Sequence, residues 1–114
     1  MTRLLVVDDH APFRGLVREV LERSGFEIVG EADDGAAALA ATAALRPDAV
    51  LLDIGLPDGD GFDFCERLTA SGVTVVLMSS RTAAELAPRI AASSARAFLP
   101  KARLSAQAVR ELLP

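Results

Sequence analysis

The sequence has a single cysteine and lacks any long apolar run. Its single cysteine, Cys65, cannot form an internal disulfide, and no charged and apolar leader precedes the first apolar run, so we expect a cytoplasmic location. No apolar run approaches the ~18 residues that indicate a membrane span. The net charge of −4, with acids and bases interleaved, lacks the basic patch typical of nucleic-acid surfaces. We therefore expect neither a membrane nor a nucleic acid as a partner of this chain.

What the sequence does contain is enough apolar material for one core. A length of 114 residues is the usual size of one domain, and 51% of the residues are hydrophobic. No repeat or low-complexity linker divides the chain. We predict one domain over residues 1–114, and the stop directly after Leu113 favours a complete one-domain protein over a domain excised from a longer chain.

Segments typical of strands alternate along this domain with segments that have the hydrophobic periodicity of helices. Short apolar runs predict five strands, over residues 4–7, 27–31, 49–52, 73–78 and 97–99. The first of the helical segments between them has an apolar stripe that includes Phe13, Leu16 and Val17. Further helices are predicted over residues 36–45, over 62–70 and after a Ser105 cap. Pro88 falls inside the expected fourth helix, which should therefore start near Glu85 or bend at the proline.

Strands and helices that alternate in this way predict an α/β fold. Right-handed crossovers place helices on both faces of a parallel sheet, which gives a doubly wound (βα)5 flavodoxin-like three-layer sandwich. The expected strand order is 2-1-3-4-5, which brings the first and third strands side by side at the switch point.

Four ionisable residues stand directly after predicted strands. Asp8 and Asp9 follow the first strand, Asp53 follows the third, and Lys101 comes shortly after the fifth. Because the carboxyl ends of parallel strands share one edge of the sheet, these side chains can meet in one crevice. Carboxylate oxygens are the ligands that Mg²⁺ prefers, so the pattern predicts a site for magnesium and a phosphoryl group.

Each of these residue types also has an ordinary structural interpretation. Paired aspartates often cap the next helix, which we expect for Asp33 and Asp34 but not for the pair at the switch point. A lone lysine is usually a surface residue with a solvated ammonium, and only the nearby acids favour a site for Lys101. Asp60 is expected to cap a helix, and His10 to lie in a loop at the rim of the pocket.

Four short motifs appear in order along the chain, over residues 6–10, 53–61, 78–80 and 98–101. Each is weak alone. Together, and at these spacings over essentially the whole chain, they resemble the receiver domain of bacterial two-component response regulators. The resemblance implies that Asp53 is the phosphoacceptor, whose carboxylate attacks the phosphoryl group held on a histidine of a sensor histidine kinase.

The resemblance also implies how the metal is held. Asp9 and Asp53 would bind Mg²⁺ directly, Asp8 would act chiefly through water, and Gly55 would contribute its backbone carbonyl. These ligands suit a cation that takes six oxygens and keeps several waters.

A second set of residues would sense the phosphoryl group. By resemblance, Lys101 neutralises one of its oxygens and the Ser79 hydroxyl hydrogen-bonds it. Phe98 is then the aromatic partner that turns inward when the loop after the fourth strand moves. The family often has threonine where Ser79 stands, and serine keeps the hydroxyl without the stiff β-branched rotamer.

Three classes of function stay open from the sequence. The first is a phosphoaccepting receiver, which is no enzyme beyond its own phosphotransfer and autodephosphorylation. Its downstream protein or fused output domain is unknown, and a phosphorylation-dependent homodimer is left open. The second is a receiver-like interaction module that no longer accepts phosphate, against which the five site residues Asp8, Asp9, Asp53, Ser79 and Lys101 count. The third is a small magnesium-dependent phosphatase, against which adjacent acids and the short chain count.

Overall fold

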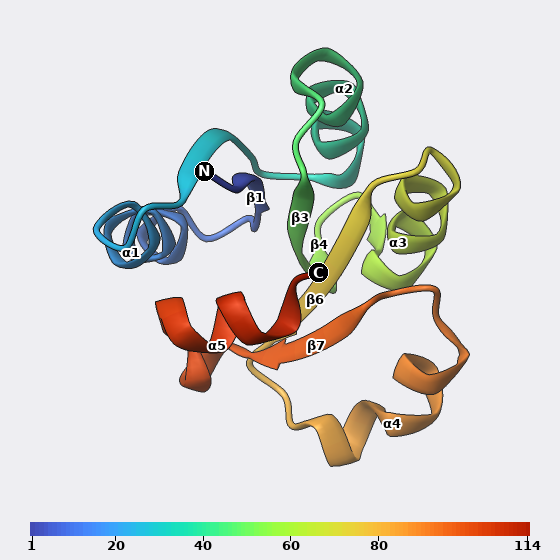
Figure 1. Ribbon diagram of the computed structural model, residues 1–114. Helices are drawn as coiled ribbons and strands as arrows, with labels where there is room; N and C mark the ends of the chain where they lie inside the picture. The colour runs from blue at the N-terminus through green and yellow to red at the C-terminus, as the bar shows by residue number, and fades with distance from the viewer.

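Five parallel strands form the central sheet of the computed structural model, which describes residues 1–114 (Figure 1). They are β1 (Arg3–Val7), β2 (Glu27–Ala32), β3 (Ala49–Asp53), β6 (Thr74–Ser79) and β7 (Ala97–Pro100). Their order across the sheet is β2-β1-β3-β6-β7, which confirms the predicted 2-1-3-4-5 order. Two further strands, β4 (Gly55–Leu56) and β5 (Gly59–Asp60), pair as a short antiparallel hairpin that the sequence patterns did not predict.

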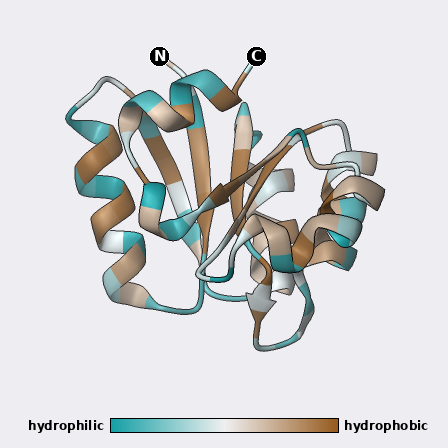
Figure 2. Cartoon of the chain, turned by 90° about the horizontal axis from the view of Figure 1, so that it is seen from below, coloured by the Kyte–Doolittle hydropathy of each residue, from teal (hydrophilic) through white to brown (hydrophobic).

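Helices cover both faces of the sheet. They are α1 (Ala11–Glu22), α2 (Gly35–Leu45), α3 (Gly61–Ala70), α4 (Ala83–Ala92) and α5 (Ala106–Leu112), with a short 3-10 turn, η1 (Lys101–Arg103), between β7 and α5. Buried residues of α1 and α5 pack on one face, and those of α2, α3 and α4 pack on the other. Figure 2 shows the apolar strands running between the two layers of helices. This three-layer arrangement confirms the predicted fold class.

The strand sequences explain why the sheet is covered on both sides. All five residues of β3 are buried, and four of the five in β1 are fully inaccessible. A strand that is apolar on both faces has no side to turn to water, so it requires a helix layer above and below.

Side-chain caps mark the beginnings of four helices. The Asp34 carboxylate accepts from the Ala37 N–H at 2.7 Å, and the Asp60 carboxylate accepts from the Phe62 N–H at 2.9 Å. The Ser105 hydroxyl accepts from the Ala108 N–H at 3.0 Å. These contacts confirm the caps predicted at Asp34, Asp60 and Ser105.

Two expectations about helices need adjustment. Helix α4 begins at Ala83, two residues before Glu85, because the Thr82 hydroxyl accepts from the Glu85 N–H at 3.3 Å and caps the helix there, and Pro88 lies inside it. On α1, the predicted apolar stripe is narrower than expected. Val17 and Leu21 are fully buried, but Leu16 is 48% exposed because it lies beside the stripe that faces the sheet.

Candidate functional site

The candidate site lies where β1, β3, β6 and β7 end. Asp53 is the last residue of β3, and Asp8 follows β1 directly. The two strands are paired neighbours, with Val7 opposite Leu52. On the other side of β3, Ser79 ends β6 opposite Pro100, and Lys101 comes next. Strand order therefore brings together side chains that are scattered over the whole sequence, as predicted.

Three carboxylates are close enough to share one cation. Oxygens of Asp8, Asp9 and Asp53 lie within 4.8 Å of one another. Asp8 is completely buried and Asp53 is 6% exposed, whereas Asp9 is exposed at the mouth. Asp9 and Asp53 also line an open pocket of about 550 Å³, which gives a ligand access to the acids.

Lys101 lies opposite these acids. Its Nζ is 2.6 Å from Asp8 Oδ2 and 3.4 Å from Asp53 Oδ2, and its side chain is 18% exposed. The ammonium also lies over the Phe13 ring, 4.6 Å from the centroid. These contacts exclude the interpretation of Lys101 as a solvated surface lysine.

The site carries more negative than positive charge. Burial and the charge of Asp8 raise the pKa of the Asp53 carboxyl, although Lys101 and the Gly55 N–H oppose this shift. Burial lowers the pKa of Lys101, but its contacts with Asp8 and Asp53 outweigh that effect, so the pKa is raised. Three carboxylates facing one ammonium form a donor set that fits a divalent cation with oxygen ligands.

Asp8 is held through both its backbone and its side chain. Its N–H donates to the Ala32 carbonyl at 3.0 Å, and its Oδ1 accepts from the His10 N–H at 2.9 Å. Its Oδ2 contacts Lys101, and its carbonyl accepts from Arg14 Nη1 at 2.5 Å. His10 itself is exposed in the loop before α1, as predicted. No sequence pattern indicates a role for Arg14, because its contact depends on how α1 packs against the sheet.

Of the residues predicted to respond to a phosphoryl group, Ser79 and Lys101 line the same pocket as Asp53, and Phe98 does not. Ser79 is 3% exposed, and its hydroxyl accepts from the Arg81 N–H at 2.9 Å. The Gly55 N–H donates to Asp53 Oδ1 at 3.3 Å, so Gly55 lies beside this carboxylate. Phe98, on β7, is partly buried against the core cluster that includes α3 and α4.

An arginine of α4 forms part of the wall of the same pocket. Arg89 pairs with Asp60, so Asp60 does more than the predicted helix cap. The guanidinium also lies over the Phe62 ring, 4.3 Å from its centroid. The sequence offered no signal for this contact, because 29 positions separate Arg89 from Asp60.

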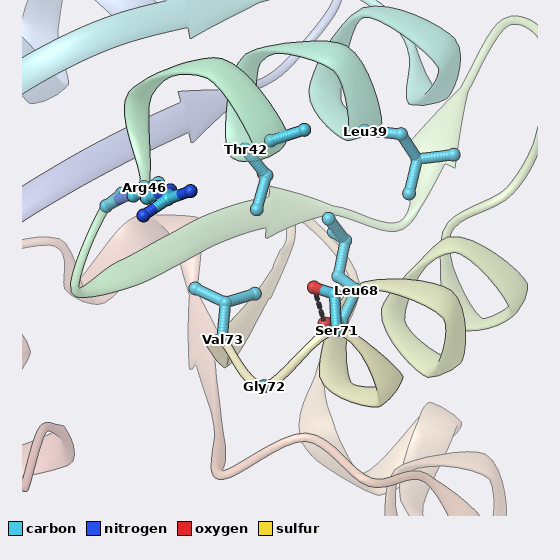
Figure 3. Close-up of a pocket in the computed structure, with 9 residues that line it drawn as sticks. Leu39, Thr42, Arg46, Leu68, Ser71, Gly72 and Val73 are labelled. Carbon is cyan, nitrogen blue, oxygen red and sulfur yellow. Dashed lines mark hydrogen bonds between the residues drawn. The ribbon is translucent and has the colours of Figure 1, made fainter.

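A second depression lies away from the acids (Figure 3). It has a volume of about 370 Å³ and is lined by the ends of α2 and α3, including Leu39, Thr42 and Leu68. Val73 and Pro47, which also line it, precede β6 and β3. It therefore lies at the amino ends of the strands. Arg46 is its only ionisable residue, so the chemistry of this chain is concentrated at the opposite edge.

The fold agrees with comparisons to known proteins. The family model described as "Response regulator receiver domain" matches residues 4–112. A protein of Pseudomonas aeruginosa is 41% identical over 103 residues, which cover 89% of this chain and 50% of that protein. The DNA-binding response regulator MtrA of Mycobacterium tuberculosis is 45% identical over 83 residues, 70% of this chain and 35% of MtrA. This chain belongs to the receiver domain family of response regulators.

Solved structures support the same assignment. The signal receiver domain of NarL from Mycobacterium tuberculosis superimposes with a TM-score of 0.87 at 34% identity, over 96% of this chain and 94% of that one. The chain spans about half the length of the first curated relatives that it matches. None of its helices is both long and apolar enough to cross a bilayer.

Proposed function

We propose that this chain is a cytoplasmic phosphoaccepting receiver of a two-component system, modified on Asp53 by a sensor histidine kinase. An Asp53 carboxylate oxygen attacks phosphorus, the phosphorus–nitrogen bond to the donor histidine breaks, and the imidazole leaves as an acyl phosphate forms. The observation that carries the proposal is the convergence of Asp9, Asp53 and Lys101 in one accessible crevice.

Asp9 and Asp53 would hold Mg²⁺, with Asp8 acting chiefly through water and Gly55 offering its carbonyl. The bound ion would neutralise charge on the phosphoryl oxygens, which is the main demand of this reaction. Lys101 contributes a second positive charge from the opposite side. Because it already contacts Asp53 in this state, it needs little reorganisation to meet a phosphoryl oxygen on that residue.

Ser79 couples the modification to the rest of the molecule. Its oxygen accepts the Arg81 N–H, which leaves the hydroxyl proton free to be donated to a phosphoryl oxygen. The modification adds nearly two negative charges, so it favours movement of the loop after β6 towards Asp53. Phe98 would then turn inward and change the surface formed by α4, β7 and α5. A shift from 1:99 to 99:1 between two states requires about 5.5 kcal/mol, within reach of several charge-assisted bonds.

The partners follow from this role. The phosphodonor is a sensor kinase, and the output is a downstream protein or an attached output domain that this region does not identify. The chain is not an enzyme acting on other substrates, and its chemistry is limited to its own phosphorylation and autodephosphorylation. A phosphorylation-dependent homodimer would be detected by size-exclusion chromatography of the modified protein.

The proposal is tested with acetyl phosphate and Mg²⁺, followed by intact-mass measurement. We expect one added phosphoryl group on the wild type and on Asp63→Asn, a matched aspartate outside the pocket. We expect none on Asp53→Asn or in the presence of a chelator. No adduct under any condition would support the interaction module instead. Unchanged labelling of Asp53→Asn would show that another residue is the nucleophile.

A further inference from the structure

The Asp8–Asp9 segment is held almost entirely through Asp8. The four contacts of Asp8 described above fix its backbone and its side chain. Asp9, in contrast, is exposed and its carboxylate makes no hydrogen bond or ion pair with the protein. The direction of the Asp9 side chain is therefore set by the peptide that joins it to Asp8. The carbonyl of that peptide is the group that Arg14 binds.

Arg14 is itself fixed from its other side. Its Nε donates to Glu31 Oε1 at 2.9 Å, while Nη1 donates to the Asp8 carbonyl. The second oxygen of Glu31 accepts from Arg18 Nε at 3.0 Å. One carboxylate near the end of β2 thus holds two arginines of α1, and only Arg14 reaches the site. A planar guanidinium held at two points restricts rotation of the group that it binds.

We propose that Arg14 is a positioning residue for the cation site, because its bond to the Asp8 carbonyl sets the peptide that directs Asp9 towards Asp53. The inference rests on the proposed function, in which Asp9 and Asp53 hold Mg²⁺. Arg14 does not touch the cation or the phosphoryl group in this role. It acts by keeping two ligands at the separation that one ion requires, so that less ordering is needed when the ion binds.

Arg14→Gln and Arg18→Gln form a matched pair for the test. Both variants remove one arginine of α1 from Glu31, but only the first removes the bond to Asp8. Arg18→Gln also loses the contacts of Arg18 with Glu22 and with the Ile28 carbonyl, which lie away from the cation site. Mg²⁺ affinity is measured on the whole chain by calorimetric titration, and unfolding by urea is measured without metal. We expect Arg14→Gln to weaken Mg²⁺ binding roughly tenfold, the usual effect of losing a residue that orients a metal ligand. We expect Arg18→Gln to bind Mg²⁺ as the wild type does.

Labelling by acetyl phosphate separates positioning from general damage. In Arg14→Gln the Mg²⁺ concentration for half-maximal rate should rise, while the rate at saturating Mg²⁺ stays near the wild-type value. If Arg14→Gln does not fold, Arg14→Lys replaces it in the test, because lysine retains one donor for the Asp8 carbonyl. We expect the Mg²⁺ affinity of Arg14→Lys to be lower than that of the wild type, by less than about tenfold.

The outcomes are distinct. Equal Mg²⁺ affinity in the wild type and the Arg14 variants would overturn the role of Arg14 and leave the proposed function intact. Equal losses in Arg14→Gln and Arg18→Gln would assign the effect to the Glu31 contacts in general, which also overturns it. A wild type that binds no Mg²⁺ would overturn both the metal site of the proposed function and this inference.

Discussion

Asp53 is the residue at which the interactions of this molecule conflict most. It is almost fully buried, it faces the charge of Asp8, and only Lys101 and one backbone N–H stabilise its ionised form. In the function proposed above, a cation or a phosphoryl group bound at Asp53 would relieve this conflict. The conflict also implies that the ionised carboxylate weakens the metal-free fold.

The stability of the metal-free protein should therefore fall as pH rises through the titration of Asp53. Because the folded-state pKa is raised above the unfolded value, the folded state binds more protons between these two pKa values. Asp53→Asn should lack this decline and should be more stable than the wild type at neutral pH. Urea unfolding in chelator across acid to neutral pH measures the difference, with Asp63→Asn as the control. A wild type that gains stability relative to Asp53→Asn over that range would contradict the prediction.

The sequence predicts those site residues that stand at the ends of strands. It does not predict the site residues that come from helices. Asp8, Asp53 and Lys101 could be placed together because parallel strands end at a common edge. Arg14 and the pair between Arg89 and Asp60 could not, because their contacts depend on where α1 and α4 pack on the sheet. No periodic pattern in the sequence indicates where these helices pack on the sheet.

At the scale of elements, the start of α3 packs closely against the end of β3, where Asp53 lies. Gly61 is the first residue of α3, and a Cβ there would lie 2.3 Å from the Ile54 Cα and 2.8 Å from the Asp53 carbonyl oxygen. Both neighbours are backbone atoms and cannot rotate away. The glycine thus allows the helix to approach the end of β3 closely. Gly15, inside α1, has open space where a Cβ would stand.

Two glycine substitutions should therefore have opposite effects. We expect Gly61→Ala to destabilise the fold by about 1–3 kcal/mol, as overpacking usually does, and to slow labelling of Asp53 because its backbone must shift. We expect Gly15→Ala to stabilise the fold by about 0.5–1 kcal/mol, since alanine is the better helix former. Urea unfolding of both variants measures these changes. Equal stability of the two variants would refute the close-approach argument.

Some elements cannot be predicted from hydrophobic periodicity. Strands β4 and β5 have two residues each, which is too short for any alternation to be recognised. The start of α4 is set by the Thr82 cap and not by Pro88, which lies inside the helix. Long amphipathic or fully apolar segments were predicted within a residue or two, because burial on the sheet is the force that defines them.

At the scale of the whole molecule, the sheet separates two apolar clusters, and Cys65 lies in the one beneath α2, α3 and α4. Cys65 is completely inaccessible, and burial together with the nearby Glu66 raises the pKa of its thiol to about 12. Neither reagent nor base can reach it in the native state. Its reactivity therefore reports opening of the core as a unit.

Alkylation of Cys65 by iodoacetamide should be slow in the native protein and fast in urea. Mg²⁺ should slow it further, because a ligand that binds only the folded state adds about 2.7 kcal/mol at a hundred times its dissociation constant. Mass spectrometry of quenched samples measures the rate, and Asp53→Asn should lose the effect of Mg²⁺. Native alkylation as fast as that in urea would refute the inaccessible core, and a rate unaffected by Mg²⁺ would refute the link to the metal site.

Lys101 has a practical consequence for anyone who attaches this protein to a surface or a dye. It is the only lysine in the chain, so amine-directed reagents can react only there or at the amino terminus. Acylation of its side chain would replace the ammonium facing Asp8 and Asp53 with a neutral amide. Any molecule acylated at Lys101 would have an altered acidic site, and an appended peptide tag is the safer point of attachment.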